Sequence, residues 1–167
     1  RPIPGHLHPL DLGRASPRAG PVTARMSTVD AEGVALVTGA SRGIGRAVVI
    51  DLARAGFDVV AGMRNPDDGA DLADLVGDGS GSVVVTHLDM DDPATMDNPQ
   101  GLRVLVNNAA IELQYLPVEE VEIDEWRAVF ETNLFGLVEL TRRAIPEMRR
   151  GEDGVICNVT SSSILVS

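Results

Sequence analysis

The chain has 167 residues, of which 44% are hydrophobic and 3% aromatic, and a formal net charge of −11 at pH 7. This length fits one domain with its own core, the acidic balance argues against non-specific nucleic-acid binding, and no stretch approaches the ~18 consecutive apolar residues of a membrane span. The single cysteine, Cys157, excludes an internal disulfide framework, so we expect a cytoplasmic protein.

Residues 1–30 are predicted to form a disordered extension ahead of a domain at 31–167. Residues 1–25 hold five of the ten prolines, four arginines against one acid, and no apolar periodicity. We interpret them as upstream sequence before a natural start at Met26. A targeting peptide and an ordered arm are the two alternatives.

Short apolar runs alternate with helical patterns from residue 33 onward. The runs predict five strands, at 34–38, 57–61, 82–88, 102–106 and 154–160. Strands that alternate with helices indicate βαβ units, so the fold class is α/β, a Rossmann-type doubly wound parallel sheet. The sequence stops soon after the fifth strand, and we therefore expect the sheet to be truncated there.

Apolar residues at helical spacing predict helices between these strands. One covers 43–55, a second helical stripe lies within 70–76, and a long helix runs from Asp124 as N-cap to about Arg150, bent or broken late by Pro146. The connection between the third and fourth strands has only about a dozen residues, the minimum for a parallel crossover. We expect one or two helical turns there at most.

A glycine-rich turn, Gly39-Ala-Ser-Arg-Gly43-Ile-Gly45, joins the first strand to the first helix. Glycines at such positions allow a sharp turn, close approach of a ligand and tight helix packing, while the helix N-terminus offers free N–H groups to a pyrophosphate. A glycine turn without a ligand is the alternative. The predicted dinucleotide contacts in this turn are Gly39, Ser41, Arg42, Gly43, Ile44 and Gly45.

The tip of the second strand, where a ribose 2′ position is expected, carries Arg64 and no carboxylate within 62–66. Arg42 in the glycine turn adds a second positive charge. Guanidinium groups match phosphate geometry, so the pair favours NADP over NAD. Two solvated surface arginines are the alternative.

Five motifs in chain order resemble those of the short-chain dehydrogenases/reductases, in their single-domain ketoreductase-like branch. They are the turn at 38–45, Asp89 after the third strand, Asn107-Asn-Ala-Ala110, Asn133, and Asn158-Val-Thr-Ser-Ser162. The resemblance covers residues 33–163 and implies the remaining cofactor contacts. Asp89 would contact the adenine ring beside the Met90 backbone, while Asn108 and Ala109 would line the cofactor; a loop carboxylate and a turn are the alternatives.

The same resemblance implies two catalytic positions. Asn133 would hold a water in a proton relay, and Ser161 would hydrogen-bond the substrate oxygen, with Ser162 and Ser163 as register alternatives. Asn133 also falls on an apolar helical stripe, where a satisfied core asparagine is the alternative. Without the resemblance, the hydroxyl residues from Thr160 to Ser163 would be interpreted as a simple turn. No metal ligands are assigned.

The family chemistry implied is hydride transfer between NADP and a small-molecule carbonyl or alcohol, with a tyrosine as proton donor and a lysine lowering its pKa. Both would fall beyond Ser167, and Tyr115 lies in the wrong place to substitute, so we expect this chain to be inactive. A non-catalytic nucleotide-binding or interaction protein is the second hypothesis. The resemblance also implies a homo-oligomeric parent. Because the sheet is expected to be truncated, we expect apolar surface to be exposed on the fifth strand and on the outer face of the long helix.

Overall fold

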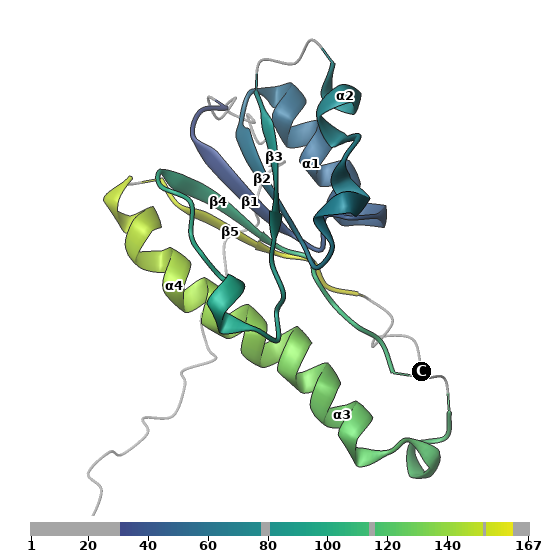
Figure 1. Ribbon diagram of the computed structural model, residues 1–167. Helices are drawn as coiled ribbons and strands as arrows, with labels where there is room; N and C mark the ends of the chain where they lie inside the picture. Colours follow the sequence, from purple (N-terminus) through teal and green to yellow (C-terminus); the bar gives the residue numbers. More distant parts are fainter. Residues whose placement is uncertain (1–30, 78–80, 114–115, 152, 162–167) are drawn as a thin grey trace, which may run out of the picture.

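The computed structural model describes residues 31–77, 81–113, 116–151 and 153–161 (Figure 1). The predicted N-terminal extension, Tyr115, Ser162 and Ser163 lie outside the described residues, so what the sequence predicts for them is untested.

The predicted five-stranded parallel sheet is confirmed. Its strands are β1 (Val34–Thr38), β2 (Asp58–Met63), β3 (Val83–His87), β4 (Leu102–Asn107) and β5 (Val155–Asn158). They lie in the order β3-β2-β1-β4-β5, and every neighbouring pair is parallel. The chain thus builds outward from β1 to β3, then returns to the other side of β1. This reversal makes β1 and β4 the point where a ligand crevice is expected.

Helices cover both faces of the sheet (Figure 1). On one face lie α1 (Gly43–Ala55), the 3-10 turn η1 (Pro66–Gly69) and the short α2 (Leu72–Val76); on the other, α3 (Ile123–Phe130), a π-helical segment η4 (Glu131–Gly136) and α4 (Leu137–Arg150) follow without a break. Two further 3-10 turns are η2 (Pro93–Thr95) and η3 (Val118–Glu120). No helix in the described part of the chain has the length and apolarity needed to cross a membrane.

Strand β1 is buried on both faces and separates two apolar cores. Val37 packs with Val49 of α1 on one side, whereas its neighbour Leu36 packs with Leu105 and Leu140 on the other. Alternate side chains of a strand point to opposite faces, so a continuous apolar run is what a doubly covered strand requires. The apolar run at 34–38 therefore coincides with the observed strand.

The prediction of Asp124 as the N-cap is wrong. The N-cap is Glu122, and Asp124 lies in the first turn of α3, where its carboxylate accepts a hydrogen bond from Arg127 Nη1 at 2.7 Å. Acidic side chains are favourable anywhere in a first helical turn because of the helix dipole, which explains why the pattern did not fix the boundary.

Of the two outcomes predicted for Pro146, a break in the long helix is wrong, and a bend stays a prediction. Helix α4 continues through Pro146 to Arg150, because buried residues on both sides of the proline, Ala144 and Met148, pack on the sheet. The irregular stretch is instead η4, where the hydrogen bonding is π-helical.

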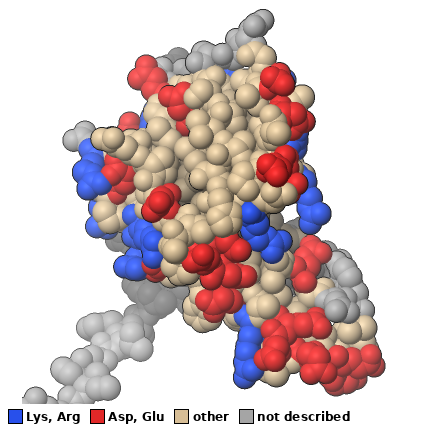
Figure 2. All heavy atoms as spheres, in the orientation of Figure 1, with Lys and Arg blue, Asp and Glu red and all other residues tan. Residues whose placement is uncertain are grey.

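The short crossover between β3 and β4 is confirmed. Within the fully described segment 88–101, η2 is the only helical turn. Above α4, the visible face of the sheet is largely uncharged (Figure 2). Val84 of β3 is 60% exposed, and Ile156 of β5 is also exposed. The outer face of the long helix likewise exposes Phe130, Phe135 and Val138. Exposed apolar surface was predicted on this face, but not which residues provide it.

Candidate cofactor site

A pocket of about 710 Å³ opens at the carboxyl ends of β1, β2, β3 and β4. Parallel α/β sheets bind ligands at this edge, where the strand order reverses. Eight of the residues predicted to contact the cofactor line it: Gly39, Ser41, Arg42, Arg64, Asp89, Met90, Asn108 and Ala109.

The end of β1 is tied to the end of β4 by reciprocal hydrogen bonds. Thr38 is fully buried, and its Oγ1 accepts from Asn108 N at 3.0 Å and from Ala109 N at 2.9 Å. In return, Asn108 Nδ2 donates to Thr38 O at 3.0 Å and to Gly39 O at 3.1 Å. These bonds set the spacing of the glycine turn and the β4 loop, both of which line the pocket.

The later glycines of the turn do not line the pocket but shape it. A Cβ added to Gly45 would lie 2.4 Å from both Asn108 Nδ2 and Gly39 O, so this position admits no side chain. Gly43 has a φ of +58°, and an added Cβ would meet nothing within 4 Å. Ile44, predicted as a cofactor contact, is 63% exposed and lies outside the pocket lining.

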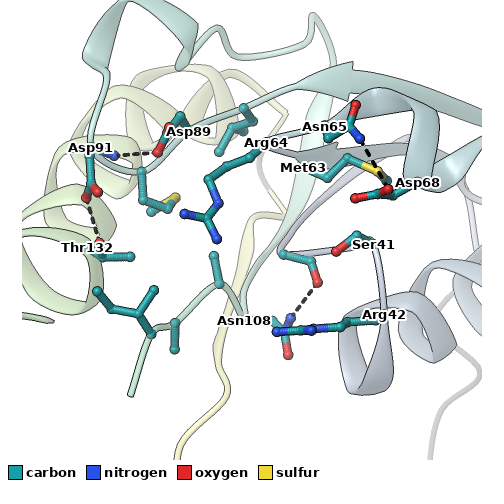
Figure 3. A pocket seen from close by; sticks show the side chains of 16 residues that line it. Ser41, Arg42, Met63, Arg64, Asn65, Asp68, Asp89, Asp91, Asn108 and Thr132 are labelled. Atoms are coloured by element: carbon teal, nitrogen blue, oxygen red, sulfur yellow. Dashed lines mark hydrogen bonds between the residues drawn. The ribbon is translucent and has the colours of Figure 1, made fainter. Parts of the chain in front are cut away.

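Two arginines from different elements enter the pocket (Figure 3). Arg42 directly precedes α1, and Arg64 directly follows β2. Neither guanidinium has a hydrogen bond or ion pair with any residue that the structure describes. Two positive charges without protein partners in one pocket favour an anionic ligand.

A carboxylate that the sequence-based prediction missed also lines this end of the pocket. Asp68 lies in η1, and its Oδ1 accepts a hydrogen bond from Asn65 Nδ2 at 3.2 Å (Figure 3). The prediction considered only residues 62–66 at the strand tip. Because η1 folds the chain back beside β2, the acidic side chain two residues further on reaches the same pocket.

Asp89 is held in a tight turn after β3. Its Oδ1 accepts from Asp91 N at 3.1 Å, while its backbone N donates to Thr95 Oγ1 at 2.9 Å. Asp91 Oδ1 in turn accepts from Thr132 Oγ1 at 2.6 Å (Figure 3). Thr132 therefore joins the π-helical segment to the turn that carries Asp89.

The remaining pocket residues were missed by sequence reasoning. Met63 ends β2 and Leu88 directly follows β3, so their position was an available signal, and the others except Thr132 lie two to five residues beyond the end of a strand. Thr132 had no such signal, because its proximity to the pocket depends on helix packing. The missed residues are Met63, Asn65, Asp68, Leu88, Asp91, Ala110, Ile111 and Thr132.

The two residues predicted to be catalytic lie outside this pocket lining. Asn133 Oδ1 accepts from Ile111 N at 2.9 Å, and its Nδ2 donates to Ile111 O at 2.8 Å. Its side chain therefore holds the segment after β4, as a satisfied asparagine does. Ser161 follows β5 at the same edge of the sheet and is exposed.

An ion pair beside the pocket joins α1 to the segment before α2. Arg46 Nη2 lies 2.5 Å from Asp71 Oδ1, and this hydrogen bond holds the pKa of Asp71 below its ordinary value. Arg46 also donates to Asp68 O at 3.3 Å. Among the described residues, no three His, Cys, Asp or Glu side chains are grouped to hold a metal.

The strand order, the glycine turn and the pocket at the switch point define a dinucleotide-binding α/β protein. Residues 33–167 match the family model described as short chain dehydrogenase. The chain belongs to this family of oxidoreductases, and the resemblance drawn from its motifs is confirmed.

The relatives found by comparison are longer proteins. The chain is 34% identical over 137 residues to a 3-oxoacyl-[acyl-carrier-protein] reductase of Synechocystis, covering 77% of this chain and 55% of that protein. It is 30% identical to a 3-ketoacyl-ACP reductase of Sinorhizobium meliloti, with a TM-score of 0.69 over 77% of this chain and 53% of the other. The chain spans about half the length of the curated relatives it matches.

A third likeness is to an alcohol dehydrogenase of the archaeon Thermococcus sibiricus, solved in complex with 5-hydroxy-NADP. The sequence identity is 28% and the TM-score 0.69, with 78% of this chain and 58% of that chain covered.

Proposed function

We propose that the pocket binds a nicotinamide dinucleotide and prefers NADP to NAD. The observation that carries this proposal is the pair Arg42 and Arg64, whose guanidinium groups enter the pocket from two elements without a protein partner among the described residues. The 2′-phosphate of NADP would supply a negative charge to which both guanidinium groups could donate hydrogen bonds. The archaeal relative bound to 5-hydroxy-NADP supports the same cofactor class.

The pocket has the features that such a cofactor needs. The open space beside Gly43 leaves room for a pyrophosphate at the start of α1, a helix of 13 residues. At the other end, Asp89 and Met90 form the proposed adenine wall, while Asn108 and Ala109 face the cofactor from β4. These assignments keep the roles that the family resemblance implies for each position.

For the whole protein, we propose hydride transfer between the cofactor and a carbonyl or alcohol substrate. The bound nicotinamide supplies or accepts the hydride. In this proposal, Ser161 orients and polarises the substrate oxygen. Asn133 supports the neighbouring chain segment through its paired hydrogen bonds to Ile111. A cytoplasmic setting and a homo-oligomeric whole protein belong to the same proposal.

This 167-residue chain is proposed to bind the cofactor without turning it over. Its only tyrosine is Tyr115, and the 14 residues counted as lysine or arginine are all arginine. The tyrosine and lysine that the family chemistry uses are therefore not both present in this sequence. For the whole protein, the alternative is a non-catalytic nucleotide-binding or interaction protein. NADPH oxidation by this chain with any of a panel of aldehydes and ketones would exclude it.

The cofactor proposal is tested by fluorescence titration of the chain with NADPH and with NADH. We expect NADPH to bind more tightly, and Arg64→Ala to weaken NADPH by about tenfold with little change for NADH. Arg149→Ala is the matched control, since Arg149 is an exposed arginine at the far end of α4 and does not line the pocket. Tighter NADH binding, or an Arg64→Ala variant indistinguishable from the control, would overturn the preference.

A further inference from the structure

The turn that carries Asp89 lies along one face of the long helix and touches it at three points. Thr132 Oγ1 donates to Asp91 Oδ1 at 2.6 Å, and Arg143 Nη1 donates to Pro93 O at 2.7 Å. Between them, a Cβ added to Gly136 would lie 2.2 Å from Met90 O, so helix and turn are in direct contact. Residues 132, 136 and 143 share one helix face, being four and eleven residues apart.

The connection that carries Asp89 contains little helix of its own. Within segment 88–101 the only helical turn is η2, three residues long. Thr95 fixes the backbone of Asp89 from within the turn, through bonds to its N and its O. The hydrogen bond from Thr132 is different, because it comes from another element and ends on a side chain.

We propose that Thr132 is a positioning residue for the Asp89 carboxylate and acts through Asp91. Thr132 is 7% exposed, so its hydroxyl is held in place by packing. It orients Asp91, whose backbone N–H bonds Asp89 Oδ1 at 3.1 Å and thereby fixes the Asp89 side chain at the pocket wall. The proposal rests on the proposed function, since it concerns how the adenine end of the pocket is held.

Adenosine 5′-monophosphate is the probe, measured by its competition with NADPH in the fluorescence titration. We expect Thr132→Val, which removes the hydroxyl and keeps the shape, to weaken this nucleotide by about fivefold to tenfold. Thr132→Ser restores the hydroxyl and is expected to bind like the wild-type chain. Thr141→Val is the matched control: it removes a hydroxyl of the same helix that bonds Asn107 Nδ2, away from the turn. It should retain wild-type affinity for the nucleotide.

Asp91→Ala distinguishes action through Asp91 from direct contact between Thr132 and the ligand. Asp91 is exposed, so this variant tests the proposal even if Thr132→Val folds poorly. We expect it to weaken binding as much as Thr132→Val does, and the double variant to bind no more weakly than either single one. Additive losses, or a Thr132→Val variant with wild-type affinity, would overturn the positioning role alone. A wild-type chain that binds neither NADPH nor the monophosphate would overturn the proposed function as well.

Discussion

Thr38 and Asn108 are 70 residues apart in the chain, yet each supplies both a backbone and a side-chain group to the other's hydrogen bonds. Thr38 Oγ1 also accepts from Ala109 N, so one buried hydroxyl serves two backbone N–H groups at the end of β4. Because residues that line the pocket follow both β1 and β4, this pair holds two parts of the pocket wall together.

Replacing Thr38 by valine should destabilise the fold. The substitution keeps the shape of the side chain but leaves the N–H groups of Asn108 and Ala109 without their acceptor. We expect a loss of about 2 kcal/mol in the free energy of unfolding, measured by urea denaturation. Thr38→Ser retains the acceptor and should lose less, so an equal loss for both variants would contradict this explanation.

Gly45→Ala is expected to be among the most damaging single-methyl substitutions in the turn. Its new Cβ would collide with Asn108 Nδ2 and Gly39 O, each 2.4 Å away, so the turn and the β4 loop would have to separate. Cofactor affinity should fall at least tenfold, and the unfolding temperature should drop. Gly151→Ala is the control, because its nearest heavy atom would be 3.7 Å away and its φ is −87°. Equal thermal stability of the two variants would refute the close contact.

Asp68→Asn should strengthen NADPH binding. In the proposed site the Asp68 carboxylate shares the pocket with Arg64 and would lie near a 2′-phosphate, so removing its negative charge removes a repulsion. We expect about a threefold gain in NADPH affinity at low salt, and a smaller gain at 0.5 M salt, where charges are screened. Asp74→Asn, an exposed acid of α2 outside the pocket lining, controls for net charge. An equal gain in NADPH affinity for Asp74→Asn would show that the gain comes from the net charge of the chain and not from a local repulsion at Asp68.

Acid should weaken the fold partly through Glu139. Hydrogen bonds from Arg143 Nε, at 2.7 Å, and from Arg142 hold the pKa of Glu139 below its ordinary 4.5. The unfolded chain therefore binds a proton more readily, and this stabilisation is present above about pH 4.5 and is lost as the pH falls through the lowered pKa. In Glu139→Gln, stability should depend less on pH between about pH 5 and pH 3. Glu119→Gln, on the exposed turn η3, should keep the wild-type slope in the same urea series.

The exposed stripe of the long helix should promote self-association. Ile123, Phe130, Leu134 and Val138 follow one another at helical spacing and are all exposed, with Phe135 beside them. Replacing Phe130 and Phe135 by serine should lower the apparent mass seen by light scattering at high concentration. Val118→Ser removes a still more exposed apolar side chain elsewhere and should leave the mass unchanged. Association that persists in the double variant would point to another surface.

The features predicted most accurately from the sequence are those that depend on residues close to one another in the chain. The limits of β1 and α1 were predicted to the residue, because a buried strand, a glycine turn and a helix closed by Gly56 each have a local signal. The position of Arg64 at the tip of the second strand was predicted for the same reason, since it directly follows β2, whereas its role stays a prediction.

What could not be predicted depends on how distant segments pack. The hydrogen bond between Thr132 and Asp91 joins residues 41 positions apart. Nothing in the local sequence around either residue predicts this bond. Similarly, the sequence showed that Asn133 lies on an apolar stripe but not that both ends of its amide are used by Ile111. The π-helical segment at 131–136 has no signature in the residue pattern, and Pro146 does not break the helix in which it lies.

The position of β1 at the centre of the sheet has a consequence for the order of folding. One edge of β1 pairs with β2, which is nearby in the chain. The other edge pairs with β4, whose residues come about 70 positions later. Contacts between such distant residues form slowly, because the chain loses entropy in closing a long loop before the contacts can stabilise it. The early half of the domain, up to β3, can therefore assemble before the edge of β1 that faces β4 is covered. The pocket is completed only by this late pairing, so a ligand bound there would stabilise the last stage of folding and slow the first stage of unfolding.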